Sequence, residues 1–261
     1  MRVPFFQVDA FASRRFEGNP AAVLLLEHFP EDADLQAIAA ENNLAETAFL
    51  VALDDGWRIR WFTPTVEVPL CGHATLASAA VVMERLEPGR THVVFESASG
   101  PLPVRRTASG YAMDFPARFP APIAAPEALS RALGVRPVEI VADRFNYLAR
   151  LHCAQDVRDL APDLALIATL DRSGVIATAP GDGRHDFTSR YFAPAKGIPE
   201  DAVTGGAHCA LAPFWAERLG RTDFRAWQAS RRGGEILCRL RGERVELEGA
   251  CVFYLEGVAE V

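Results

Sequence analysis

Two alanine-rich segments 133 residues apart repeat each other, and this repeat restricts the possible folds more than any other feature of the sequence. The first is GHATLASAAVVMERL, from Gly72 to Leu86, and the second is GGAHCALAPFWAERL, from Gly205 to Leu219. They share seven of fifteen positions without a gap. Because the offset is close to half of the 261-residue chain, the repeat predicts two related halves.

Both alanine-rich segments have the composition of a buried helix. Apolar residues surround the axis of each over its first three turns, and a helix that is apolar on every side is packed inside a protein. Short runs rich in Val, Phe and Ile flank the helices and predict strands, among them Val3–Phe11, Thr47–Leu53 and Trp57–Phe62. We therefore expect an α/β (α+β) protein with two pseudo-symmetric domains, each a curved, mostly antiparallel, barrel-like sheet around a central helix.

A proline-rich stretch, PARFPAPIAAPEAL (116–129), is the best candidate for the connection between the halves, because its four prolines disfavour regular structure. We expect an N-terminal domain over residues 1–118 and a C-terminal domain over residues 119–261. The sequence leaves open whether the last strand, CVFYLEGVAEV (251–261), stays with the second half or returns to the first. Pro213, inside the second helix, predicts a kink or an early end of that helix.

Composition argues against several classes of protein. The net charge is −7 and no basic stretch is dense enough to bind a phosphate backbone, so nucleic acid is not an expected partner. Five scattered cysteines without a CxxC pair indicate reduced thiols in a cytoplasmic protein. The first residues, MRVPFFQVDAF, are too polar for a signal peptide, and no apolar run approaches the ~18 residues that span a bilayer. We expect no contact with a membrane.

Each repeated helix begins with glycine, which exposes backbone N–H groups at the positive end of the helix dipole. Gly72 opens the first helix, and Gly205 and Gly206 open the second. Such openings bind anions well, so two of them could face each other across a cleft and hold a substrate carboxylate or other polar group. The alternative is that the glycines only allow the helix to pack closely against the sheet.

Three titratable residues lie at unusual places in this pattern. Glu46 falls between a helix end and an apolar strand in NNLAETAFL, His73 lies in the first helix opening, and Asp201 lies four residues before Gly205. Taken singly, each has an ordinary explanation as a cap, a surface acid or a satisfied polar residue. Together they could form an acid/base set in a cleft that excludes water.

Several motifs at this point resemble one family, the PhzF-like phenazine-biosynthesis isomerases. They are VDAFASRRFEGNPAAVLL, NNLAETAFL, FTPTVEVPLCGHATLASA, YFAPAKGIPEDAVTGGAHCALAPFW and QASRRGGEILCRL, which together span nearly the whole chain. The resemblance implies the diaminopimelate-epimerase-like fold, with two α/β halves that each wrap a barrel-like sheet around a helix. It also implies a homodimer.

The resemblance assigns roles to four residues of this chain. Glu46 matches the glutamate that moves a proton within a dihydro-hydroxyanthranilate, and His73 matches the histidine of the G-H-A-T motif. Asp201 matches the aspartate of the E-D-P-V-T-G-S-A motif, and Asn19 matches the asparagine of the G-N-P motif. Asn19 is then a substrate contact, although a Gly-Asn-Pro turn explains it equally well.

Two positions depart from the aspartate motif. Ala202 stands where the family has proline, and Gly206 stands where it has serine. The missing hydroxyl removes one substrate contact, which places the phenazine precursor in question as the substrate. The fold and the acid/base set are unaffected.

We therefore expect an isomerase that needs no metal and no cofactor. Glu46 would act as base and then acid on one face of a small substrate that carries a carboxylate or an amine, with a pKa raised by burial. His73 and Asp201 would hold the substrate, and the openings at Gly72, Gly205 and Gly206 would stabilise developing negative charge.

Two other functions remain open on the same fold. An amino-acid racemase or epimerase would need two opposed thiols, but the residue equivalent to Cys71 is Thr204, so a two-cysteine mechanism is disfavoured. Cys71 is then only a small buried residue. A non-catalytic protein that binds a small molecule is the third possibility, because a fold does not determine a function.

Overall fold

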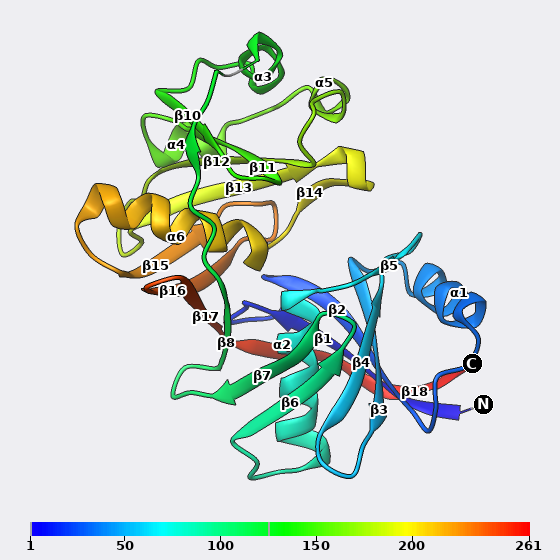
Figure 1. Ribbon diagram of the computed structural model, residues 1–261. Coiled ribbons are helices and arrows are strands. Elements are labelled where there is room, and N and C mark those ends of the chain that lie inside the picture. Colours follow the sequence, from blue (N-terminus) through cyan, green and yellow to red (C-terminus); the bar gives the residue numbers. More distant parts are fainter. Residues whose placement is uncertain (1, 125) are drawn as a thin grey trace. The chain divides into compact units, whose positions relative to one another are not determined.

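The computed structural model describes residues 2–124 and 126–261, which fall into two compact units (Figure 1). Unit 1 comprises residues 1–114 and 248–261, and unit 2 comprises residues 115–247. The first boundary lies four residues before the one expected from the proline-rich stretch. The last strand, which the sequence left unassigned, belongs with the first unit because it pairs with the first strand of the chain.

Unit 1 contains one long run of paired strands. β18 (Cys251–Glu260) pairs antiparallel with β1 (Arg2–Ala10), from Arg2 opposite Glu260 to Ala10 opposite Cys251, with an irregularity at Gln7/Val8. The run continues through β2 (Asn19–Leu26), β3 (Glu46–Ala52), β4 (Trp57–Phe62), β6 (His92–Ser97), β7 (Gly100–Arg106) and β8 (Tyr111–Pro116), and the short β5 (Glu67–Val68) also pairs with β4. The pairs β2–β3 and β4–β6 are parallel and the others are antiparallel.

Unit 2 repeats this arrangement. Its strands are β9 (Ala121–Pro122), β10 (Glu139–Ala142), β11 (Asn146–Arg150), β12 (Gly174–Pro180), β13 (Phe187–Ala193), β14 (Ile198–Asp201), β15 (Asp223–Gln228), β16 (Gly234–Arg241) and β17 (Arg244–Gly249). The pairs β10–β11, β12–β13, β13–β14 and β15–β16 are antiparallel, while β11–β12 and β13–β15 are parallel. The same order of directions links β1 to β7 in unit 1, so the duplication inferred from two helices extends to the sheet topology.

One long helix in each unit carries the repeated sequence. In unit 1, α2 (Gly72–Val81) is buried from His73 to Val81, packs on β1, β2 and β3, and runs on into a π-helical turn, η1 (Val82–Leu86) (Figure 1). In unit 2, α6 (Gly205–Leu219) is buried along nearly all of its first eleven residues. This burial agrees with the expected central helix, since neither segment has a polar face over those turns.

Short helices complete both units and lie in the connections between strands. They are α1 (Asp32–Asn42), α3 (Glu127–Leu133), α4 (Ala154–Arg158), α5 (Leu164–Ala168) and the 3₁₀ turn η2 (Pro194–Lys196). Among the residues that the structure describes, no helix is both long enough and apolar enough to cross a membrane.

The second long helix does not end at its proline. Pro213 has no N–H to donate to the carbonyl of Cys209, yet α6 continues to Leu219. The backbone N–H of Arg118 donates to that carbonyl instead, at 2.9 Å. The expected early end of the helix is therefore wrong, because a segment distant in sequence replaces the missing hydrogen bond.

Candidate active site

Four polar side chains of unit 1 meet where two parallel strands and the long helix all begin. Asn19 is the first residue of β2, and Glu46 is the first residue of β3. Because β2 and β3 are parallel, their first residues lie at the same edge of the sheet. Cys71 and His73 come from the first turn of α2. Local sequence therefore places each residue at the start of an element, and the strand pairing brings them together.

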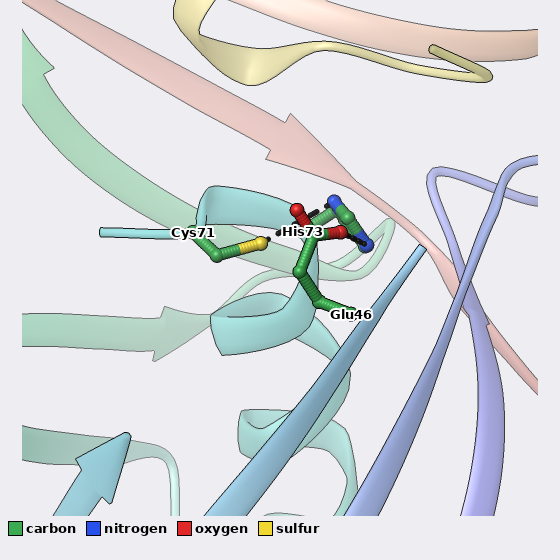
Figure 2. Close-up of side chains that lie close together, drawn as sticks. All are labelled: Glu46, Cys71 and His73. Carbon is green, nitrogen blue, oxygen red and sulfur yellow. Dashed lines mark hydrogen bonds and ion pairs between the residues drawn. The ribbon is translucent and has the colours of Figure 1, made fainter. Parts of the chain in front are cut away.

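The helix opening has no side-chain cap from its own N-cap residue. Cys71 has an extended backbone and its thiol makes no capping bond, while its carbonyl accepts the N–H of Thr75 at 3.2 Å. The hydroxyl of Thr75 donates to the same carbonyl at 2.6 Å, which holds the first turn in place. The Cys71 thiol is thus left to point toward His73 rather than to stabilise the helix end (Figure 2).

His73 lies at the centre of this cluster (Figure 2). Its Nε2 is 3.2 Å from Oε2 of Glu46, and its Nδ1 is 3.2 Å from the amide nitrogen of Asn19 and 3.5 Å from Sγ of Cys71. All four side chains are nearly inaccessible, with residue exposures from 1% for Asn19 to 9% for Glu46. The sequence singled out Asn19, Glu46 and His73, and it missed Cys71 as a neighbour of the imidazole.

The imidazole of His73 is neutral in the ordinary pH range. Burial is the largest influence and lowers the pKa of His73 from 6.5 to about 3, while the backbone of Pro20 acts in the opposite direction. With the amide nitrogen of Asn19 as the donor to Nδ1, the ring proton lies on Nε2, which faces Glu46. Nε2 lacks a well-directed hydrogen bond despite its 3.2 Å distance from the carboxylate. We therefore treat this contact as a carboxylate beside a neutral N–H group rather than as an ion pair.

The same cluster has the residue types of a metal site. Glu46, Cys71 and His73 each offer one ligand atom, and these three atoms lie within 4.8 Å of one another.

In unit 2, Asp201 is held at the end of β14 by a partly buried network of hydrogen bonds. The hydroxyl of Thr204, the residue before α6, donates to Oδ2 of Asp201 at 2.6 Å. The fully buried Gln228 accepts the N–H of Thr204 at 2.8 Å and donates to the carbonyl of Asp201 at 2.8 Å. His208 reaches the carbonyl of Thr204 at 2.8 Å. Gln228 therefore fixes the turn that presents Asp201.

Sequence reasoning found Asp201 but assigned no role to Gln228. The sequence identifies the segment QASRRGGEILCRL only as a family motif. Its serine, Ser230, donates to the carbonyl of Ala202 at 2.7 Å and accepts the N–H of Gly233 at 3.1 Å. Two side chains of this motif thus bind the segment that follows β14, and only the tertiary structure shows which segment they hold.

Close packing does not explain the two glycines that open α6. A Cβ at Gly205 would lie 3.5 Å from a Leu247 methyl group, and one at Gly206 would lie 3.8 Å from Arg118. Both are ordinary van der Waals distances. The alternative that these glycines exist only to let the helix approach the sheet is therefore wrong for unit 2, and their expected part in substrate binding stays a prediction.

The duplicated topology shows why the two units carry different acids. In unit 1, Thr47 pairs with Phe62, and in unit 2 the equivalent pair is Val175 with Phe192. Glu46 precedes Thr47 and Gly174 precedes Val175, so Gly174 is the position equivalent to Glu46. A Cβ at Gly174 would lie 2.3 Å from Oη of Tyr191 and 2.6 Å from Oδ1 of Asn146. That tyrosine and that asparagine are hydrogen-bonded at 3.1 Å. Unit 2 therefore has no room for a carboxylate at this strand position.

The acid of unit 2 comes from the next hairpin instead. In unit 2, Asp201 pairs with Tyr191 across the hairpin, and in unit 1 Val68 pairs with Trp61 in the same way. The residue of unit 1 that is equivalent to Asp201 is therefore the apolar Val68. With the helix openings aligned, His73 corresponds to Gly206. Each titratable residue of the predicted set is therefore present in one copy only.

Comparison with known proteins supports the resemblance inferred from the motifs. The model of a family described as phenazine biosynthesis-like protein matches residues 8–257. A Pseudomonas aeruginosa protein named "uncharacterized isomerase" is 48% identical over 257 residues, which cover 98% of each chain. A crystal structure described as a phenazine biosynthesis protein of the PhzF family, from Enterococcus faecalis, is 41% identical with a TM-score of 0.96 and covers 100% of both chains. A predicted epimerase from Pseudomonas aeruginosa is 25% identical with a TM-score of 0.75, and 99% of each chain is covered.

Proposed function

Because this chain belongs to the phenazine biosynthesis-like protein family, we propose that it is an isomerase that moves a proton within a small cyclic amino or hydroxy acid of the dihydro-hydroxyanthranilate type, without a cofactor. The observation that supports this most directly is the buried carboxylate of Glu46 beside the neutral imidazole of His73, at the opening of α2. A positioned carboxylate is one of the groups that serve as a general base for proton abstraction.

The proposed reaction uses Glu46 twice. The carboxylate removes a proton from a substrate carbon as that C–H bond breaks, and the electron pair moves into the conjugated system. The same proton then returns to a second carbon on the same face, which restores the carboxylate. One acid/base group is sufficient for this transfer, because the proton that leaves is the proton that returns.

The neutral state of His73 favours this role for Glu46. A protonated imidazole 3.2 Å from Oε2 would stabilise the carboxylate as an ion pair and make it a weaker base. A neutral ring places no positive charge beside the carboxylate of Glu46. The backbone N–H groups at the start of α2 are available to stabilise negative charge on the substrate. Asp201 is proposed as a further contact for a substrate amine or hydroxyl.

The racemase and the binding protein remain the rival functions. A two-base racemase needs a second acid on the opposite face, and the position equivalent to Cys71 holds Thr204. A binding protein needs no proton transfer and would leave substrate hydrogens unexchanged in heavy water. An isomerase gives a new tautomer, a two-base racemase incorporates solvent deuterium at the stereocentre, and a binding protein does neither, so NMR of the substrate in heavy water separates the three functions.

The test is the Glu46→Gln variant, followed by NMR in heavy water with dihydro-hydroxyanthranilate and cyclic amino acids as candidates. We expect turnover to fall by about two to four powers of ten, because the amide keeps the shape of the side chain and loses its basicity. Glu41→Gln, an exposed carboxylate on α1, is the matched control and should keep full activity. A folded Glu46→Gln variant with near-normal turnover would rule out Glu46 as the base.

A further inference from the structure

Glu46, Cys71 and His73 combine three side-chain types that bind zinc in proteins. A thiolate, an imidazole and a carboxylate are all established zinc ligands. The three residues come from two elements, the start of β3 and the start of α2, so their spacing in the sequence does not resemble any metal motif. Only the fold brings them together, and all three are buried (Figure 2).

The distances suit a tetrahedral ion. With Zn–S near about 2.3 Å and Zn–N near about 2.0 Å, adjacent sulfur and nitrogen ligands lie roughly 3.5 Å apart. Sγ of Cys71 and Nδ1 of His73 are 3.5 Å apart. The three ligand atoms lie within 4.8 Å of one another, so a side-chain movement of about 1 Å would bring the carboxylate to the spacing that a tetrahedral site requires.

The charges also suit a divalent ion. A thiolate and a carboxylate together neutralise Zn²⁺, which matters because an uncompensated charge is costly in a buried place. The ion would bind Nδ1 of His73, the ring nitrogen beside the Cys71 thiol, in place of the contact that Nδ1 makes with the amide nitrogen of Asn19 at 3.2 Å. Three protein ligands leave the fourth position open to water or to a substrate oxygen.

We propose that Glu46, Cys71 and His73 form a reversible zinc site, and that a bound ion stops the isomerase by occupying the carboxylate that acts as its base. The binding itself does not depend on the proposed isomerase activity. The inhibition rests on that proposed function, and it is therefore measured separately.

The binding experiment is a titration of the whole protein with Zn²⁺ against a chromophoric chelator, without substrate. We expect one ion bound per chain in the wild type and at least a tenfold weaker affinity in Cys71→Ala. Cys153→Ala, which removes an exposed thiol, is the matched control and should keep the wild-type affinity. Equal affinity in the wild type and Cys71→Ala, or loss of the ion in Cys153→Ala alone, would overturn the proposal.

A spectroscopic measurement and a second variant keep the binding test valid if Cys71→Ala fails to fold. Cobalt bound to the wild type should show near-ultraviolet thiolate absorption, and a cobalt complex without this absorption would contradict a cysteine ligand. Cys71→Ser replaces Cys71→Ala if circular dichroism shows that the alanine variant is unfolded. For inhibition, the ratio of the turnover rates with and without Zn²⁺ should be at most about one tenth in the wild type and near one in Cys71→Ala. If zinc binds but leaves this ratio at one in the wild type, the site stands and the inhibition is refuted.

Discussion

Two buried histidines should make the stability of this protein fall as the pH is lowered from 7 to 5. Burial lowers the pKa of His73 to about 3 and the pKa of His208 to about 4, from an ordinary value of 6.5. His208 lies against the ring of Phe187, with ring centroids 6.0 Å apart, and its Nδ1 is 2.8 Å from the carbonyl of Thr204. Neither imidazole can gain a proton in the folded state without a large desolvation penalty.

The direction and the size of this change in stability follow from these pKa values. Between pH 6.5 and the folded-state pKa, the unfolded chain binds a proton that the folded chain does not, so the free energy of unfolding falls as the pH falls. At pH 5 each histidine then lowers that free energy by on the order of 2 kcal/mol relative to pH 7. Carboxylates with lowered pKa values, such as Glu139 and Asp223, act mainly below this window, because they bind protons in the unfolded chain only near pH 4.

The assay is urea unfolding at pH 7 and pH 5, followed by tryptophan fluorescence and circular dichroism. His73→Gln and His208→Gln should each reduce the loss between the two pH values by on the order of 2 kcal/mol, whatever their stability at pH 7. His92→Gln, which removes an exposed histidine, is the control and should show the wild-type loss. If His208→Gln keeps the full wild-type dependence on pH, the burial argument is wrong.

Two further predictions concern the features that distinguish unit 2. Gly174→Ala should lower the free energy of unfolding by about 1–3 kcal/mol, because the new Cβ would lie 2.3 Å from Oη of Tyr191. Gly205→Ala, whose Cβ would have its nearest neighbour at 3.5 Å, should change the free energy of unfolding by less than about 0.5 kcal/mol. Equal losses for the two variants in urea unfolding would contradict this explanation. Gln228→Leu should raise KM several-fold and change kcat only slightly, because the substitution releases the turn that presents Asp201. An unchanged KM in folded Gln228→Leu would refute the positioning role.

Much of the fold could be predicted because its signals are local. The repeated helices have no polar face, the flanking runs have strand composition, and the motifs match one family along nearly the whole chain. The expected fold class and the family resemblance are confirmed by the pairing pattern and by the structures to which the chain is similar. Glu46, His73 and Asn19 could be selected because each lies at an element boundary or in a family motif. Their catalytic roles stay predictions.

Long-range pairing could not be predicted in the same way. β18 returns to β1 because complementary strand edges meet across almost the whole length of the chain, and no local pattern encodes that partner. Of the two outcomes that the sequence predicts for Pro213, a kink or an early end of α6, the early end is wrong, because the backbone N–H of Arg118, far away in the sequence, satisfies the carbonyl that Pro213 leaves free. The sequence predicts only a small buried residue at Cys71, because it gives no sign that the thiol lies beside the His73 ring.

The sequence by itself determined that the protein is a duplication, because two matching helices half a chain apart require two similar environments. Only the tertiary structure decided how the duplicated units came to differ. The position equivalent to Glu46 is Gly174, where the hydroxyl of Tyr191 and the amide of Asn146 occupy the space of any side chain. Because these two side chains exclude a side chain at Gly174, only unit 1 has a carboxylate at this position of the strand, namely Glu46. The packing of side chains in a folded core cannot be read from the order of residues in the sequence.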